Sequence, residues 1–122
     1  MSNKKLALKR HHLEKLREVH EIIQQDPQQH ATIDNLALTV GANRNLLVTG
    51  FREKYGTGIY QLQISLKLDK AKKLLLQTDK AVKDIAHLCG YKTVSGLRKA
   101  FKHEYGLSPS LFRKKELNGR GL

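Results

Sequence analysis

Cationic and polar side chains gather on one side of the segment from about residue 94 to residue 105. Leu97, Phe101 and Tyr105 recur at steps of four, the spacing of one helix face, so we expect them to face a core. At about 100° per residue, the opposite side carries Ser95, Arg98, Lys99 and Lys102. Arginine and lysine donate either to guanine O6 and N7 or to phosphate, and the spacing leaves both partners open. The alternative is a solvated cationic face.

A second segment, about residues 44–55, has the same form but a nearly neutral outer side. Leu47, Phe51 and Tyr55 form its expected buried stripe, and its outward set is Asn45, Val48, Thr49 and Arg52. An asparagine amide can pair with adenine, a threonine hydroxyl can bond a base edge, and a valine can contact a thymine methyl. The alternative is an ordinary helix surface. We therefore predict two unequal DNA-reading faces, of which the one in residues 94–105 is the stronger anchor.

The other reactive side chains do not predict catalysis. His11 and His12 are sequence neighbours and point in different directions on a helix, so they make a poor metal pair. The single cysteine, Cys89, aligns with Val40 in the internal repeat described below, which indicates a small core residue. No phosphate loop, nucleophile elbow or HExxH motif occurs in the sequence. We expect no enzyme activity, no catalytic residue, no metal and no cofactor.

The charge of the chain favours a polyanionic partner. Its 122 residues include 23 Lys plus Arg against 11 Asp plus Glu, a formal net charge of +12. Such an excess favours nucleic acid through counterion release, with anionic lipid or plain basicity as the alternatives. No apolar run approaches the roughly 20 residues of a membrane span. With one cysteine and no signal-peptide pattern, we expect a cytoplasmic protein at the bacterial nucleoid.

Helical periodicity runs through nearly the whole chain and predicts an all-α fold of about seven helices. The expected helices cover about residues 11–25, 32–41, 44–55, 59–77, 82–89, 94–105 and 109–115. Asp26-Pro27 should end the first helix, Thr32 should cap the second, and Ser108-Pro109 should start the last.

The two short helix pairs of the sequence are copies of each other. Ile33, Leu36, Ala37, Val40 and Gly41 recur forty-nine positions later, as Val82, Ile85, Ala86, Cys89 and Gly90. Leu47, Gly50, Phe51, Tyr55 and Gly56 recur fifty positions later, as Leu97, Ala100, Phe101, Tyr105 and Gly106. The shift of one residue falls in the turn between the helices of each pair. A short helix, a tight glycine turn and a second helix together predict a helix-turn-helix in each copy.

This repeat predicts two helix-turn-helix subdomains, each a homeodomain-like three-helix unit, joined by a long helix. We expect a basic lead-in over 1–10, a first subdomain over 11–58 and a linking helix over 59–77. A second subdomain over 78–116 and a flexible tail over 117–122 complete the chain. The linking helix would be about 28 Å long, against the roughly 34 Å between successive major-groove segments.

Residues 82–114 resemble the signature of the AraC/XylS transcription regulators. The resemblance lies in the Ile-Ala pair, Gly90-Tyr91, Phe101-Lys102, Gly106, Ser108-Pro109 and Arg113. Residues 67–75 also resemble the linking helix of that family, and residues 41–61 are similar to its siderophore- and iron-linked members.

The resemblance implies two recognition helices that enter successive major grooves of duplex DNA to regulate transcription. It places base-reading positions at Asn45, Val48, Thr49, Val94, Ser95, Arg98 and Lys99. It also implies an effector-sensing domain in a missing amino-terminal portion, and the basic stretch from Ser2 to Arg10 resembles an interdomain linker. The alternative function is a protein-interaction module that docks mainly on RNA polymerase or a partner domain.

Overall fold

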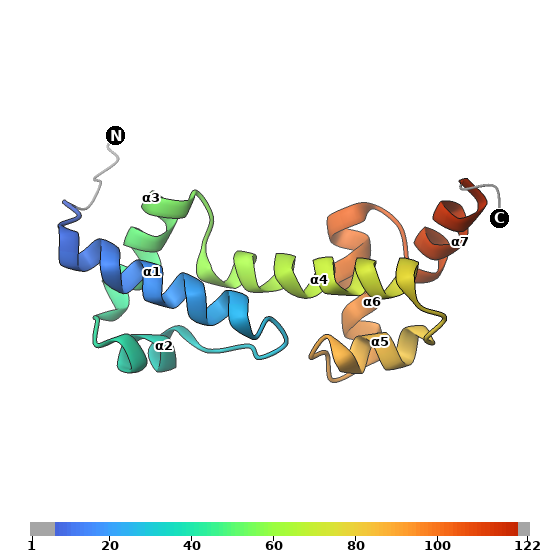
Figure 1. The fold of residues 1–122 in the computed structure, drawn as a ribbon, viewed down its shortest axis with the longest axis horizontal. Coiled ribbons are helices and arrows are strands. Elements are labelled where there is room, and N and C mark those ends of the chain that lie inside the picture. Colours follow the sequence, from blue (N-terminus) through green and yellow to red (C-terminus); the bar gives the residue numbers. More distant parts are fainter. Residues whose placement is uncertain (1–6, 120–122) are drawn as a thin grey trace. The chain divides into compact units, whose positions relative to one another are not determined.

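The structure, a computed structural model, describes residues 7–119, and within that range every regular element is a helix (Figure 1). The elements are α1 (Arg10–Gln25), α2 (Ile33–Val40), η1 (Leu46–Gly50), α3 (Phe51–Tyr55), α4 (Ile59–Gln77), α5 (Val82–Leu88), α6 (Val94–Tyr105) and α7 (Pro109–Gly119). The predicted all-α class with seven α-helices is confirmed. Contacts divide the chain into two units: unit 1 ends at Gln63 and unit 2 begins at Ile64, inside α4.

The core of unit 1 is built by α1, α2 and the helical segment that follows them. The buried side chains of these elements include Leu16, Val19, Ile23, Ile33, Leu36, Val40, Leu47 and Phe51. The first turns of α4 belong to this unit, and there the buried Gln63 amide donates to the Ala31 carbonyl at 3.0 Å. This bond ties the loop before α2 to α4.

Local capping groups fix where the helices of unit 1 begin and end. The Thr32 hydroxyl accepts from the Asn35 amide at 3.1 Å, which confirms the predicted cap of α2. Gly41 ends α2 in the left-handed region at φ 71°, where glycine has no steric penalty. Asn43 then caps the next segment by accepting from the Leu46 amide at 2.8 Å. The turn between the two helices is therefore very short.

The segment from Arg44 to Tyr55 contains a π-helical turn over Leu46–Gly50. Gly50 is buried there: a Cβ atom at this position would lie 3.0 Å from Leu46 Cδ1 and 3.3 Å from Leu16 Cδ1. Gly50 thus allows a close approach to α1. The uniform 100° spacing that we assumed for this segment is wrong, because a π turn holds more residues per turn.

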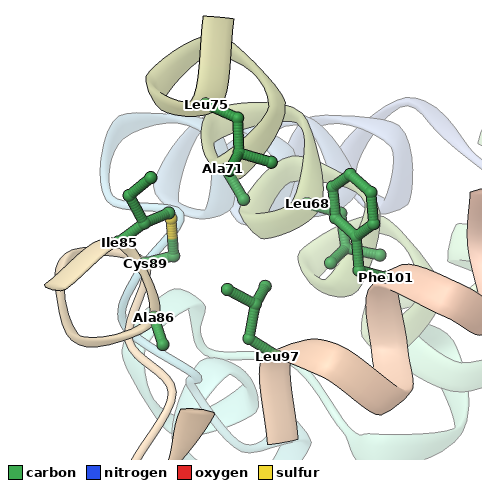
Figure 2. Close-up of a cluster of buried hydrophobic side chains, with 8 residues drawn as sticks. All are labelled: Leu68, Ala71, Leu75, Ile85, Ala86, Cys89, Leu97 and Phe101. Carbon is green, nitrogen blue, oxygen red and sulfur yellow. The ribbon is translucent and has the colours of Figure 1, made fainter. Parts of the chain in front are cut away.

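The core of unit 2 joins α4, α5 and α6 (Figure 2). The eight clustered side chains are Leu68, Ala71, Leu75, Ile85, Ala86, Cys89, Leu97 and Phe101. Ala86 and Cys89 are small where α5 approaches the neighbouring helices. Cys89 is fully buried, and the predicted core role of this residue is confirmed.

The ends of the helices in unit 2 differ in how well they are capped. Thr93 accepts from the Gly96 amide at 3.0 Å and Ser108 accepts from the Leu111 amide at 3.2 Å, so both predicted starts have a side-chain cap. Ala81 precedes α5 and offers no side-chain acceptor. The start of α5 is the weakest of the three.

Arg113 on α7 holds the end of α4. Its Nε donates to the Leu75 carbonyl at 2.9 Å and its Nη2 to the Thr78 carbonyl at 3.2 Å. These carbonyls have no partner within the helix at its carboxyl end, so the guanidinium satisfies acceptors that would otherwise be unpaired. The interaction fixes α7 against α4.

Several helix ends differ from the sequence expectation, and one of them is the end of α5, at Leu88 instead of Cys89. The first helix begins at Arg10, one residue before the predicted start, and α7 continues to Gly119 instead of ending near Lys115. Neither proline nor a capping glycine interrupts the chain between Lys115 and Gly119, so the last helix can continue. Most of the predicted lead-in and the end of the predicted tail lie outside the described residues.

Candidate nucleic-acid interface

The α6 helix presents the predicted cationic face of unit 2 to solvent. Leu97 and Phe101 are fully buried, and the side chains of Ser95, Arg98, Lys99 and Lys102 are exposed. Val94 lies at the start of the helix, half-buried and packed against the cluster of Figure 2. The structure therefore brings four of the five predicted positions together on one exposed face, while Val94 faces partly inward.

The cations of this face are available to an external anion. Within the described residues, Arg98, Lys99 and Lys102 take part in no ion pair, and none is buried. An α-helix spaces residues at i, i+1 and i+4 on adjacent parts of its surface, so the three charges form one patch. Such a patch can donate to base edges and to phosphates.

A basic hollow of about 500 Å³ lies beside this face, between α5 and the turn before α6. Its lining includes Lys80, Lys83, His87 and Lys92. Our sequence reasoning did not select these residues. Lys83 and His87 are four residues apart on α5, and that helical spacing was the available signal.

The corresponding face of unit 1 lacks free cations at its centre. Asn45 is exposed, Val48 has 43% of its surface exposed, and Thr49 is half-buried. The Thr49 hydroxyl donates to the Asn45 side-chain oxygen at 3.4 Å, so these two predicted residues lie together. The face is polar and apolar, but uncharged.

Two of the cations around the face of unit 1 bond other groups, and the third, Arg52, is directed away from its centre. Arg44 pairs with Asp34 of α2 at 2.8 Å, and the Lys54 ammonium donates to the Leu13 carbonyl at 3.3 Å. The Arg52 guanidinium lies against Gly58. If Gly58 carried a Cβ atom, that atom would be 2.7 Å from Nη2 of Arg52. Arg52 is thus directed toward the start of α4.

The two faces can be compared position by position in sequence because the helix caps share one register, although the π turn of Leu46–Gly50 has no counterpart in α6. Asn43 and Thr93 are fifty residues apart and cap the two segments at the same point. Val48 is therefore equivalent to Arg98, and Thr49 to Lys99. The extra residue of copy two lies in the turn, as predicted, because Ala42 stands opposite Tyr91-Lys92.

The interior behind the turn of unit 2 contains an unusual buried lysine. Lys67 is 6% exposed and its ammonium lies 5.0 Å from the centre of the Tyr91 ring. Burial lowers the pKa of Lys67, and the neighbouring Cys89 opposes that shift. Burial raises the pKa of the Cys89 thiol, against the influence of Lys70 and Lys67. A buried thiol with a raised pKa is a poor nucleophile, which agrees with a packing role.

Other site chemistries have little support in the described part of the chain. No group of three or more His, Cys, Asp and Glu side chains there could hold a metal ion. None of the described helices is both long and apolar enough to cross a bilayer.

Residues 36–115 match the sequence profile of a family described as "Helix-turn-helix domain". The chain is similar to the xylose operon regulatory protein of Escherichia coli strain K12, with 31% identity over 81 residues, which are 66% of this chain and 21% of that protein. It is also similar to a putative AraC-like transcription regulator of Streptomyces lividans, with 29% identity over 92 residues, 75% of this chain and 30% of the relative. The chain thus spans less than a third of the length of these relatives.

Among solved structures, the fold is similar to the DNA-binding domain of AdpA, described as a global transcriptional factor, in complex with a target DNA. The TM-score is 0.81 and the identity 25%, over 88% of this chain and 96% of that domain. Coverage of 88% of the chain means that the similarity extends over both units.

Proposed function

Because this chain belongs to the AraC-type helix-turn-helix family of transcription regulators, we propose that its two units read successive major-groove segments of one duplex DNA site. The family consists of DNA-binding regulators and not of enzymes. In this proposal α6 is the recognition helix of unit 2, and residues 44–55 are the recognition helix of unit 1.

The observation that carries the proposal is the duplicated face. Each unit buries one stripe of its second helix and exposes most of the opposite side, with Val48 and Arg98 exposed at equivalent positions. The exposed cations Arg98, Lys99 and Lys102 have no acidic partner among the described residues. Neighbouring cations repel one another unless an anion neutralises them. The phosphates of DNA supply such anions along the whole duplex.

Within unit 2, the residues divide into base-reading and backbone-binding roles. Arg98 and Lys99 lie at the centre of the exposed face and would reach guanine O6 and N7. Lys102 and the lysines of the basic hollow lie around that centre and would bind phosphates. Phosphate contacts fix the register of the protein on the duplex but do not distinguish one base sequence from another. In unit 1, Asn45, Val48 and Thr49 would contact bases, and Arg52 lies at the edge.

The finer parts of the proposal concern the whole regulator. The relatives are more than three times longer than the stretch that matches them. We infer that effector sensing belongs to a segment outside residues 1–122, that RNA polymerase is a further partner, and that DNA keeps the protein at the bacterial nucleoid. Each of these would be tested on the complete regulator.

Selection from a random duplex pool tests the central proposal. The chain is incubated with duplexes that contain a randomised stretch of about 30 base pairs, and bound duplexes are amplified and sequenced over several rounds. We expect enrichment of one sequence that spans two adjacent half-sites. Retention of duplexes without any sequence enrichment would contradict specific reading, and the absence of retention at low salt would point to a protein-docking module.

A further inference from the structure

We infer that unit 1 selects its half of the DNA site through the C5 methyl group of a thymine, which packs against Val48. This inference rests on the proposed function and adds the chemistry by which one unit chooses its bases. In this inference, unit 1 contacts a methyl group of the DNA, whereas unit 2 contacts the DNA through cationic side chains.

Val48 is an apolar group displayed at the centre of a recognition surface. Leu46, Leu47 and Phe51 surround it in sequence and are at most 8% exposed, whereas Val48 is 43% exposed. Its neighbours thus face the core, while much of the Val48 side chain is open to solvent. A valine is stiff at χ1, so its two methyl groups present a fixed apolar surface.

Two of the cations near Val48 bond other groups, and a third is directed toward the start of α4. Arg44 is neutralised by Asp34, Lys54 bonds the backbone of α1, and Arg52 lies against Gly58. Recognition of guanine by its O6 and N7 is the usual work of arginine or lysine. Because Arg44 and Lys54 bond other groups and Arg52 is directed toward Gly58, the centre of this face offers apolar surface and amide donors.

The polar neighbours of Val48 complete the match to thymine. The Thr49 hydroxyl donates to the Asn45 side-chain oxygen, which leaves the amide hydrogens of Asn45 as the donors nearest the face. In the major groove a thymine shows an O4 acceptor beside its C5 methyl group, and its adenine partner shows N7. Of the four bases, only thymine carries a methyl group in this groove.

The equivalent position in unit 2 carries a different kind of side chain, so a methyl contact at this position would be specific to unit 1. Val48 stands where α6 has Arg98, in the same register and on the same kind of exposed face. The shared scaffold thus carries an apolar side chain in one copy and a cation in the other. The two half-sites should therefore differ in base composition.

A scan with deoxyuridine tests this inference. Deoxyuridine retains the O4 acceptor of thymidine and lacks only the methyl group. The selected duplex is resynthesised with each thymine replaced in turn, and binding of the chain is measured by fluorescence anisotropy. We expect one thymine, or two adjacent ones, at which the replacement weakens binding about fourfold, the usual effect of removing one buried methyl group. Replacements elsewhere should change the affinity less than twofold.

Matched variants assign the effect to Val48. In Val48→Ala the thymine and uracil duplexes should bind equally well, while Arg98→Ala should retain the fourfold penalty. Leu111→Ala, another exposed apolar residue, serves as control and should behave as the wild type. The inference is overturned if no thymine is sensitive, or if the penalty persists in Val48→Ala. A pool that yields no preferred sequence would instead reject the proposed function, and the inference with it.

Discussion

At the scale of single residues, the two units place different chemistry on equivalent positions. Arg98 and Val48 occupy the same register, yet one is a free cation and the other an exposed apolar side chain. A cation attracts any phosphate over several ångströms and bonds guanine at short range, whereas a methyl contact acts only at van der Waals distance. Unit 2 should therefore supply more of the affinity.

Replacement of Arg98 by alanine should weaken binding to the selected duplex more than to a scrambled one. A bidentate bond to guanine is worth about 1–3 kcal/mol of discrimination, and alanine cannot form it. Anisotropy titrations of both duplexes measure this difference. Lys73→Ala is the control, because Lys73 is an exposed cation on α4 that pairs with Asp69. An equal loss on both duplexes would assign Arg98 to a phosphate.

Replacement of Cys89 by valine should change how stability depends on pH. Burial raises the pKa of the folded thiol above its ordinary value of 9.0, so above that pH the unfolded chain loses a proton that the folded chain retains. Stability contributed by the thiol is thus present below pH 9 and is lost as the pH rises toward the folded pKa. The variant lacks this loss and keeps a similar volume, as Val40 does in the other copy.

Urea unfolding of both proteins from pH 7 to pH 10 measures the effect. The free energy of unfolding of the wild type, relative to Cys89→Val, should decline above pH 9. A constant difference over this range would mean that the folded thiol ionises as readily as the unfolded one.

The sequence alone predicts many of these residues and misses others for a physical reason. Arg98, Lys99 and Lys102 follow from helical spacing, because α6 is regular from Val94 to Tyr105. The direction of Arg52 and the pairing of Arg44 with Asp34 depend on a π turn and on contacts between helices. Spacing along one helix carries no information about such contacts.

At the scale of elements, the first helices of the two helix-turn-helix pairs differ at their starts. Thr32 caps α2 through its hydroxyl, whereas Ala81 leaves the first amides of α5 without a side-chain acceptor. Both helices have eight residues or fewer, so a cap is a large part of their local stability. The difference was visible in the sequence, because a cap depends on one residue type at one position.

Ala81→Ser should stabilise the protein by about 0.5–1 kcal/mol, since serine supplies the missing acceptor. Thr32→Ala should destabilise it by about 1 kcal/mol for the opposite reason. Thermal or urea unfolding of the two variants beside the wild type measures both effects. A neutral Ala81→Ser would show that solvent already satisfies the start of α5.

The basic hollow between α5 and the turn should act as a phosphate-binding element. Lys83→Gln combined with Lys92→Gln removes two of its charges while keeping both side chains polar. The slope of log affinity against log salt should fall by about 0.9 for each phosphate that the variant no longer binds, to the same extent on selected and scrambled DNA. An unchanged slope would place the hollow outside the interface, and Lys73→Gln is the matched control.

At the scale of the whole molecule, one duplicated scaffold carries two different surfaces. The duplication was predictable because core positions repeat with fixed spacing, and burial requires particular sizes at those positions. The exposed faces have diverged, since solvent-facing positions are free of packing constraints. Under the proposed function, this freedom would let the two units recognise different halves of one asymmetric DNA site.

The central claim is that this chain recognises a particular duplex sequence through both units, and a competition titration tests it most directly. The labelled selected duplex is bound at about 150 mM salt and displaced by unlabelled selected or scrambled duplex. The account predicts that the scrambled duplex competes at least a hundredfold more weakly, within the usual range for specific DNA-binding proteins. Equal competition by the two duplexes would contradict it.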